Sequence, residues 1–364
     1  MRMIYDLELP ELAELLKSWQ EPAYRAKQIW QGVYRQYYNS PDQFSNLSRP
    51  LREKLAEHLD FSALQPRRQI DSSDSQTRKL LFELSDGLQI ETVLMRYDPT
   101  THAGRDRRTL CISTQAGCAM GCVFCATGQM GFKRNLSSGE IVAQVIYFAR
   151  VLKDENLTVT NVVMMGMGEP FHNYDNTMAA IDRLNDPQGY NLGARRFTIS
   201  TVGLVPAIRR FADEKRQVNL AISLHSVDED TRLAMLPITR RYNIDEILHA
   251  CNYYVMQTSR RVSFEWALIS GVNDSPEVAR QLANRLRGLM CHVNAIPLNP
   301  TVGYPGAATS RDRAMLFKET LEQAGIPCTI RMRRGIDIQA GCGQLAGAVS
   351  SSPIQIEQRS KLDL

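Results

Sequence analysis

The stretch CISTQAGCAMGCVFCATG, residues 111–128, contains four of the eight cysteines of this 364-residue chain. Cys118, Cys122 and Cys125 follow the spacing C-x3-C-x2-C, and Cys111 stands seven residues ahead of them. A structural zinc ion normally takes four protein ligands, so three thiols suit it poorly. Thiolates also hold iron–sulfur clusters, and three of them leave one iron of a four-iron cluster open to a small molecule. We therefore expect a four-iron cluster; a zinc site with a distant fourth ligand and a chance grouping are the alternatives.

The composition is that of an ordinary globular protein, with 43% hydrophobic and 23% charged residues. No apolar run approaches the roughly 20 residues that span a bilayer. The first residues, MRMIYDLELPELAELL, carry acids where a signal peptide has a basic and then an apolar region. We expect a cytoplasmic protein without a membrane partner, in which clustered cysteines bind metal or take part in catalysis. The net charge of +4 leaves RNA binding open.

Residues 1–64 are predicted to form a small N-terminal helical accessory domain. Apolar side chains recur three or four residues apart in PELAELLKSW, AYRAKQIWQGVYRQ and SRPLREKLAEHL. The second segment interleaves Tyr24, Trp30 and Tyr34 with basic residues. Such a mixture can bind RNA by stacking and phosphate contact, or it can supply the core of a helical bundle. The sequence favours neither interpretation.

A β-hairpin extension is predicted over residues 65–98. The segments RKLLFEL and LQIETVLMRY are joined through Ser85-Asp86-Gly87, a turn sequence. The polar segment 98–108 is expected to be a linker or an exposed loop. The catalytic core is placed at residues 99–345, followed by a C-terminal tail at residues 346–364.

From Thr109 onward, short apolar strands alternate with longer amphipathic stretches, which predicts an α/β core. At least six such strands imply a parallel sheet with covering helices, most simply a full or partial (β/α) barrel. In that architecture chemistry gathers where the strands end. The segments MMGMGEP, STVG, SLHS and PLNP fall at those ends.

The cysteine segment CAMGCVFC resembles the signature of radical S-adenosylmethionine (radical SAM) enzymes, with Phe124 at the aromatic position. The resemblance extends over nearly the whole chain, because NVVMMGMGEP, ISTVG, LAISLH, IPLNP and GIDIQAGCGQL follow in the order seen in radical SAM RNA adenosine methyltransferases. It implies a partial barrel and one [4Fe-4S] cluster on Cys118, Cys122 and Cys125, with SAM at the open iron. The positions that it assigns to SAM binding are Gly168, Glu169, Ser200, Ser223, Leu224, His225 and Asn299.

The same resemblance gives the outlying cysteines a role. It implies that Cys342 in AGCGQL takes a methyl group from one SAM molecule, and that a second SAM supplies a 5′-deoxyadenosyl radical. That radical activates the methyl group for addition to adenine. Glu91 in IETVLM is implied to accept a proton, and Cys111 to release the product through a transient disulfide with Cys342. A lone cysteine in a strand such as TLCIST is otherwise usually a buried hydrophobe.

The family's substrates are an adenosine of 23S rRNA in the peptidyl transferase centre and, for the carbon-2 branch, tRNA. DIQAGC has the longer D-I-x-A-x-C spacing typical of carbon-2 enzymes, whereas several other segments are closer to the carbon-8 branch. The expected partners are these RNAs and an electron donor such as flavodoxin or ferredoxin, and the expected state is a monomer. The competing classes are an iron–sulfur electron carrier and a non-catalytic, zinc-stapled RNA-binding module.

Overall fold

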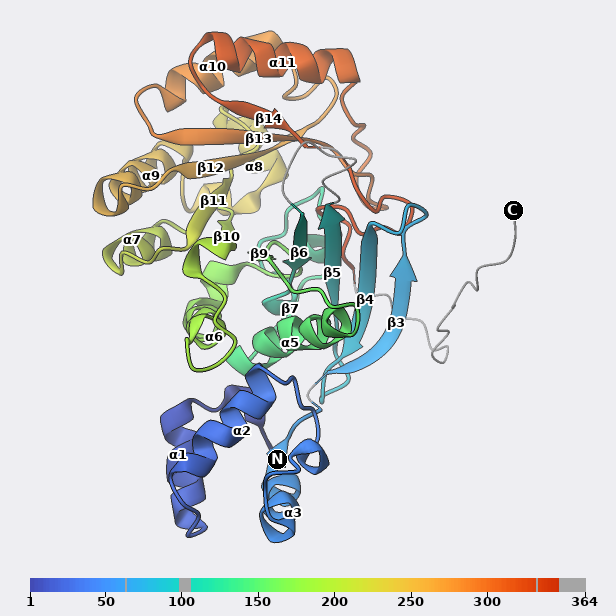
Figure 1. Cartoon of the computed structure of the whole chain (residues 1–364). Coiled ribbons are helices and arrows are strands. Elements are labelled where there is room, and N and C mark those ends of the chain that lie inside the picture. Colours follow the sequence, from blue (N-terminus) through green and yellow to red (C-terminus); the bar gives the residue numbers. More distant parts are fainter. Residues whose placement is uncertain (63, 98–105, 332, 347–364) are drawn as a thin grey trace.

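A computed structural model describes residues 1–62, 64–97, 106–331 and 333–346 (Figure 1). Its main feature is a sheet that has ten strands in this described part of the chain, in the order β14-β13-β12-β11-β10-β9-β6-β5-β4-β3. The strand bounds are β1 Arg2–Met3, β2 Leu59–Asp60, β3 Gln65–Asp71, β4 Thr77–Glu83, β5 Gln89–Tyr97, β6 Arg107–Cys111, β7 Gln115–Gly117, β8 Phe132–Asn135, β9 Asn161–Met164, β10 Phe197–Thr201, β11 Asn219–Ser223, β12 Val262–Leu268, β13 Cys291–Pro297 and β14 Cys328–Ile330.

The helices alternate with the strands in the larger part of the chain. Their bounds are α1 Leu9–Ser18, α2 Tyr24–Tyr34, α3 Arg49–His58, α4 Ala126–Gln129, α5 Ser138–Asp154, α6 Tyr174–Asn185, α7 Val205–Asp213, α8 Glu229–Met235, α9 Ile244–Thr258, α10 Pro276–Leu286 and α11 Arg311–Gln323. Figure 1 shows α6, α7, α9, α10 and α11 along one outer side of the curved sheet.

The core is a partial barrel of parallel strands. From β6 through β9 to β14, each strand pairs in parallel with its neighbour. The sheet is open, because β14 stands at one edge and β3 at the other. The prediction of a parallel (β/α) core is confirmed. The last strand is shorter than the segment CTIRMRR suggested, since it ends at Ile330.

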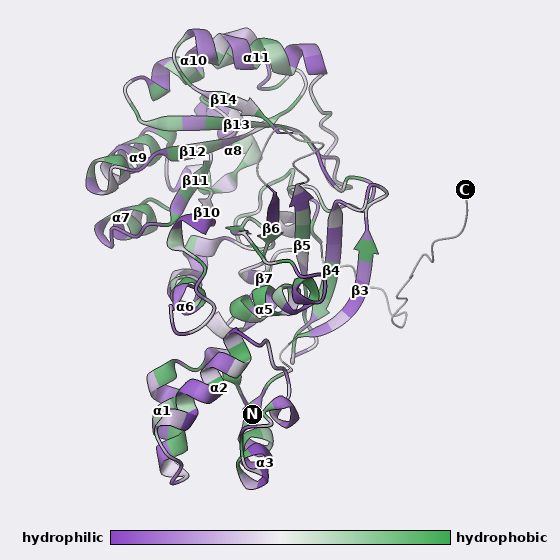
Figure 2. Ribbon diagram, in the orientation of Figure 1, coloured by the Kyte–Doolittle hydropathy of each residue, from purple (hydrophilic) through white to green (hydrophobic). Residues whose placement is uncertain are grey.

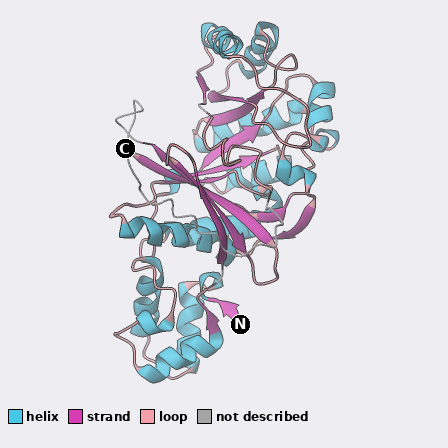
Figure 3. Ribbon diagram, turned by 90° about the vertical axis from the view of Figure 1, so that its right-hand side faces the viewer, coloured by secondary structure: helices cyan, strands magenta, loops and turns pink. Residues whose placement is uncertain are grey.

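Three antiparallel strands continue this sheet beyond β6. The predicted hairpin is present, with β4 and β5 antiparallel, and β3, which the sequence did not predict, pairs with β4. Strand β5 also pairs with β6, so the extension and the barrel share one sheet (Figure 3). Residues 98–105 of the predicted linker lie outside the described residues. Its last residues, Arg107 and Arg108, belong to β6 and not to a loop.

The N-terminal helices α1, α2 and α3 form as predicted, and they pack below α5 and α6 in Figure 1. Trp30 is 3% exposed, and Tyr34 is fully buried in the hydrophobic core that continues into the barrel. The RNA-stacking interpretation of these two aromatics is therefore wrong: they are core residues. Tyr24 remains exposed, with the Arg25 guanidinium 5.0 Å from its ring centroid.

Specific polar contacts join this helical part to the barrel. The Trp30 indole nitrogen donates to Asp186 Oδ2 at 2.7 Å, just beyond α6. Asp6 Oδ1 accepts from the Gly139 backbone N–H at 2.6 Å, at the start of α5. Figure 2 colours α5 largely hydrophobic, in agreement with its burial along most of its length. No helix in the described part of the chain is both long and apolar enough to cross a bilayer.

The C-terminal segment returns across the hairpin extension. The Ser73 backbone N–H donates to Asp337 Oδ2 at 2.8 Å, and Arg334 donates to the Arg96 carbonyl at 3.0 Å. We call residues 335–346 the Cys342 loop. Of the predicted tail 346–364, only Ala346 lies within the described residues.

Candidate active site at the carboxyl ends of the strands

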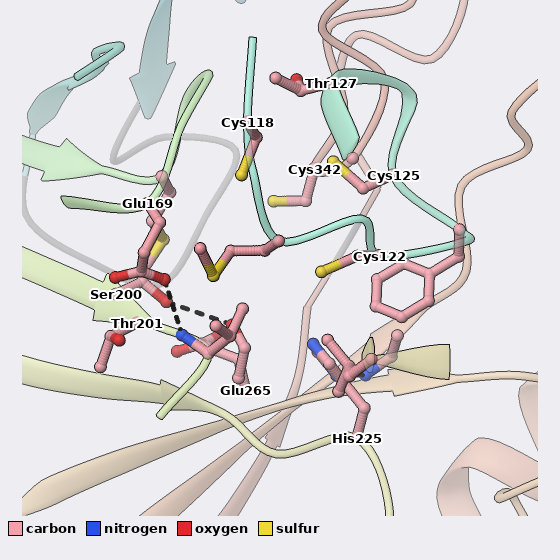
Figure 4. A pocket seen from close by; sticks show the side chains of 18 of the residues that line it. Cys118, Cys122, Cys125, Thr127, Glu169, Ser200, Thr201, His225, Glu265 and Cys342 are labelled. Atoms are coloured by element: carbon pink, nitrogen blue, oxygen red, sulfur yellow. Dashed lines mark hydrogen bonds between the residues drawn. The ribbon is translucent and has the colours of Figure 1, made fainter. Parts of the chain in front are cut away.

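A pocket lies where strands β9 to β13 end, and it encloses about 1010 Å³ counted out to its open mouth (Figure 4). Ten of the thirteen predicted site residues line it. They are Cys118, Cys122, Cys125, Gly168, Glu169, Ser200, Ser223, His225, Asn299 and Cys342. Among the described residues, Glu91, Cys111 and Leu224 are not on its wall. The parallel strands thus bring together side chains that are far apart in the sequence.

The three clustered cysteines belong to the loop between β7 and β8. The Cys118 backbone N–H donates to the Gly131 carbonyl at 3.0 Å, which closes this loop. Gly117 makes that closure possible: its φ is +74°, and a Cβ there would lie 1.9 Å from the Gly131 oxygen. In Figure 4 the three thiols and that of Cys342 lie around one space.

The chemistry of this donor set suits an iron–sulfur cluster. Burial raises the pKa of the Cys118 thiol to about 12 and holds that of Cys122 well above its ordinary value. The thiolates therefore require a compensating cation, which cluster iron provides. Within the described residues, no three His, Cys, Asp or Glu side chains converge closely enough to hold a single metal ion.

Glu169 presents a buried carboxylate to the pocket after β9. Its Oε2 accepts from the Val202 backbone N–H at 2.9 Å, and its Oε1 accepts from that of Phe171 at 3.0 Å. Burial raises its pKa to about 7, against the opposing effect of these hydrogen bonds. Gly168 must be glycine, because its φ is +103° and a Cβ would lie 2.5 Å from the Gln115 Cβ. The carboxylate can complement an ammonium group of a ligand.

Short polar side chains end the next two strands. Ser200 Oγ, on β10, lies 3.4 Å from Ser223 Oγ, on β11. His225 follows with a φ of +60° and packs edge-on against Phe124. Its Nδ1 accepts from the Ala267 backbone N–H at 2.9 Å. Burial, with the nearby Arg232 guanidinium, lowers the His225 pKa to about 3, so the ring is neutral and its Nε2 carries the proton as a donor.

Leu224, between Ser223 and His225 in the chain, does not present its side chain to the pocket. It is fully buried in the main hydrophobic core. Its backbone carbonyl accepts a hydrogen bond from Arg232 Nε at 3.1 Å, which ties this strand end to α8. Strand alternation explains the difference, because successive residues face opposite sides.

Asn299, after β13, connects the pocket to the Cys342 loop. Its Nδ2 donates to the Cys342 carbonyl at 3.0 Å, whereas its buried Oδ1 has no partner among the described residues. Such an orphaned acceptor on a pocket wall is expected where a ligand donates a hydrogen bond. Cys342 lines the pocket; it is exposed as a residue, whereas burial of its thiol raises the pKa of that group.

The cluster loop also holds the Cys342 loop. The Ala126 backbone N–H donates to the Gly343 carbonyl at 2.7 Å, and Thr127 Oγ1 donates to the Leu345 carbonyl at 2.5 Å. The sequence places these segments more than two hundred residues apart. Their contact brings Cys342 to the wall formed by the three clustered cysteines.

Cys111 and Glu91 lie behind this loop, on β6 and β5. Burial raises the pKa of the Cys111 thiol, and the nearby Cys342 thiol adds to the effect, so the two thiols are electrostatic neighbours. Glu91 is 4% exposed. Its Oε1 pairs with Lys79 Nζ at 3.0 Å, and its Oε2 accepts from the Ala346 backbone N–H at 2.8 Å. All eight cysteines are free thiols.

Two important charged residues escaped the sequence analysis. Glu265, on β12, lines the pocket; it accepts from Asn294 Nδ2 at 2.8 Å, and burial raises its pKa. The sequence feature that could have identified it is a single acidic residue in the otherwise largely apolar strand VSFEWAL. Arg232, on α8, is fully buried and donates to the Val202 carbonyl at 2.7 Å and to Thr239 Oγ1 at 2.8 Å. An arginine in EDTRLAM gave no such signal, because charged helical residues are usually exposed.

Comparison with known proteins agrees with this geometry. Residues 112–283 match the radical SAM superfamily model, and residues 3–60 match the model of the ribosomal RNA large subunit methyltransferase N-terminal domain. The dual-specificity RNA methyltransferase RlmN 1 of Myxococcus xanthus is 48% identical, over 99% of this chain and 97% of that protein. A probable dual-specificity RNA methyltransferase RlmN of Chloroflexus aurantiacus is also 48% identical, over 98% and 96%.

A solved structure gives the same relationship. The crystal structure of a radical SAM methyltransferase from Sphaerobacter thermophilus has a TM-score of 0.92 and 49% identity, over 96% of this chain and 100% of that chain. These similarities extend over nearly the full length of this chain and of its relatives, and so include both the radical SAM part and the N-terminal part. The chain belongs to the RlmN family of radical SAM RNA methyltransferases.

Proposed function

We propose that this enzyme methylates carbon 2 of adenosine in RNA, at adenosine 2503 of 23S rRNA and adenosine 37 of tRNA. The observation that carries the proposal is the place of Cys342. It lies on the wall that the three clustered cysteines form, with Cys111 as an electrostatic neighbour. The names of the relatives, dual-specificity RNA methyltransferases, support the two RNA classes. The longer D-I-x-A-x-C spacing at Cys342 supports carbon 2 over carbon 8.

The cofactors have residues suited to them. Cys118, Cys122 and Cys125 would hold one [4Fe-4S] cluster, and Glu169, Ser200, Ser223, His225 and Asn299 would bind SAM, with Gly168 allowing close approach. The bound cofactors supply one-electron reductive cleavage of SAM to a carbon-centred radical. An external donor such as flavodoxin or ferredoxin would deliver the electron. We place the enzyme in the cytoplasm as a monomer.

The chain's own residues carry the methyl group. Cys342 Sγ, having lost its proton, would bond to the methyl carbon of one SAM as the bond from that carbon to the sulfonium sulfur breaks and S-adenosylhomocysteine leaves. A hydrogen atom would then pass from the S-methyl carbon to the 5′-deoxyadenosyl radical that a second SAM supplies, giving 5′-deoxyadenosine. The carbon bonds to C2 of adenine, which joins Cys342 to the RNA. This radical adduct would give one electron to an acceptor, a role that the bound cluster can supply, and its C2 proton to Glu91, which restores the aromatic ring. A methyl group could not reach this electron-poor carbon by ordinary displacement, because displacement needs a nucleophile.

Cys111 then releases the product. Its sulfur attacks Cys342 Sγ, and the bond between that sulfur and the bridging carbon breaks as the disulfide forms. The carbon takes a proton and becomes the methyl group of the product. External thiols reduce the disulfide by exchange and restore both cysteines. Burial raises the pKa of Cys111, which favours its protonated and less nucleophilic form, so the thiol must lose its proton for this attack.

The test is anaerobic reaction of the reconstituted enzyme with methyl-deuterated SAM and RNA, followed by mass spectrometry of the nucleosides. The expected product is 2-methyladenosine, absent with Cys342→Ala and retained with Cys251→Ala, a control in the buried face of α9. Formation of 8-methyladenosine alone would assign the chain to the carbon-8 branch. Iron and sulfide in the purified protein contradict the zinc module, and SAM cleavage on reduction contradicts the electron carrier.

A further inference from the structure

One row of residues crosses the sheet beneath the Cys342 loop. Lys79 on β4 is opposite Val93 on β5, and Val93 is opposite Cys111 on β6. Residues directly opposite each other point to the same face of a sheet, and so does Glu91, two residues from Val93. Lys79, Glu91 and Cys111 therefore share the face on which the Cys342 loop lies.

Lys79 and Glu91 form a buried ion pair on this face. Lys79 Nζ is 3.0 Å from Glu91 Oε1, and the two side chains are only 10% and 5% exposed. A buried pair gives little net stability, because both charges lose their hydration. Its value lies in the direction of the remaining hydrogen bonds, and here both partners use them on the same loop.

The pair holds the loop on either side of Cys342. Lys79 Nζ donates to the Gln339 carbonyl at 3.1 Å, and Glu91 Oε2 accepts from the Ala346 backbone N–H at 2.8 Å. Only residues 340–345 lie between these two anchors, and they include the glycines on either side of Cys342. We call this ion pair, with its two hydrogen bonds, the Lys79–Glu91 clamp.

We infer that Lys79 is a positioning residue, whose clamp with Glu91 fixes both ends of the Cys342 loop over Cys111 while the thiol between them changes partner. This inference rests on the proposed function, which gives Cys342 several successive partners. Hydrogen bonds from Ala126, Thr127 and Asn299 also hold backbone carbonyls between these ends, so the thiol changes partner by rotation of the Cys342 side chain within the pocket. Lys79 also fixes the orientation of the Glu91 carboxylate.

The experiment compares Lys79→Met with the wild-type holoenzyme. Arg78→Met is the matched control, because Arg78 is the adjacent basic residue of β4 and pairs with Asp71 away from the loop. Hydrogen exchange of the peptide that contains residues 340–346 measures the clamp directly. We expect faster exchange with Lys79→Met and wild-type exchange with Arg78→Met.

Single-turnover assays measure the consequence. With Lys79→Met, we expect formation of methylated adenosine to slow about 10–100-fold, the scale on which misplacement of a reacting group acts. Iron content should not change, and Lys79→Arg, which keeps the charge and the donors, should recover most of the rate. A merely structural role would lower iron content and melting temperature together with the rate.

Wild-type loop exchange and a wild-type rate with Lys79→Met would overturn the inference. If Lys79→Met does not fold, Lys79→Gln carries the same test, because it removes the charge at similar length. If the wild-type enzyme itself methylates no adenosine, the proposed function fails. Loop exchange alone then decides whether the clamp exists.

Discussion

Asn299 Nδ2 donates to the backbone carbonyl of Cys342 at 3.0 Å, while the other end of the same amide is a buried acceptor without a partner in the described part of the chain. One side chain thus contacts the backbone of Cys342 at one end and lines the pocket at the other. It links the position of the Cys342 loop to the contents of the pocket.

Asn299→Leu keeps the side-chain volume but removes both polar functions. We expect the rate of RNA methylation to fall about 10–100-fold, because the Cys342 carbonyl loses its donor and the thiol its position. Methylation of Cys342 should slow as well, and mass spectrometry of the peptide that contains Cys342 measures it. Asn284→Leu, at an exposed position of α10, is the control. Equal rates in the two variants would contradict this role for Asn299.

Arg232→Met should destabilise the fold by about 2–4 kcal/mol, because it leaves buried carbonyls of the strand-end loops without their charged donor. Those acceptors include the Val202 and Leu224 carbonyls. Urea unfolding measures the loss, and Arg240→Met, at an exposed position, should change it little. Arg232→Lys should recover only part of the loss, since one ammonium cannot reproduce the planar fork. If Arg232→Met lowered the free energy of unfolding no more than Arg240→Met does, the strand-end loops would be stable without the Arg232 guanidinium.

The protein without its cofactors should lose stability in acid through His225. Its pKa is lowered to about 3 in the fold, against about 6.5 in the unfolded chain, so the unfolded chain binds more protons between these values. The contribution is fully present above about pH 6.5 and is lost as pH falls towards 3. The advantage of the wild type over His225→Gln in free energy of unfolding should shrink by about 1.4 kcal/mol per pH unit below 6.5. An advantage that does not change with pH would contradict the burial of a neutral ring.

Trp30→Phe should weaken the attachment of the helical N-terminal part by about 1–2 kcal/mol. The ring volume is largely kept, but the 2.7 Å hydrogen bond to Asp186 is lost. Limited proteolysis between this part and the barrel should become faster. Trp19→Phe is the control, because Trp19 contacts His58 within the helical part. Equal cleavage of both variants would contradict a specific role for the Asp186 contact.

The sequence was most informative where covalent spacing sets the chemistry. Three thiols within eight residues face one space because the chain between them is too short to separate them, and Gly168 marks a close approach that no other residue tolerates. The alternation of strands and helices predicted the parallel core for a similar reason, because the spacing of apolar residues that marks a strand or a helix can be read within one short segment of sequence.

What the sequence could not predict depends on long-range packing. Trp30 and Tyr34 could stack on RNA or fill a core, and their burial in the hydrophobic core shared with the barrel decides for the core. Strand β3 has little apolar character to mark it, and its pairing with β4 gives it its place. Lys79 is an ordinary strand lysine in the sequence. Its partners, Glu91 and Gln339, are brought to it by the sheet and by a loop about 260 residues away.

The return of the Cys342 loop to the hairpin has a consequence for synthesis of the protein. Its contacts join residues 255 and 264 positions apart, through Ala346 with Glu91 and Asp337 with Ser73. A chain that emerges from the ribosome N-terminus first can build the sheet and the three-cysteine loop before Cys342 has been translated. The thiol that we propose as the methyl carrier therefore joins the site after the three clustered cysteines, and a nascent chain that ends before Cys342 lacks the proposed carrier.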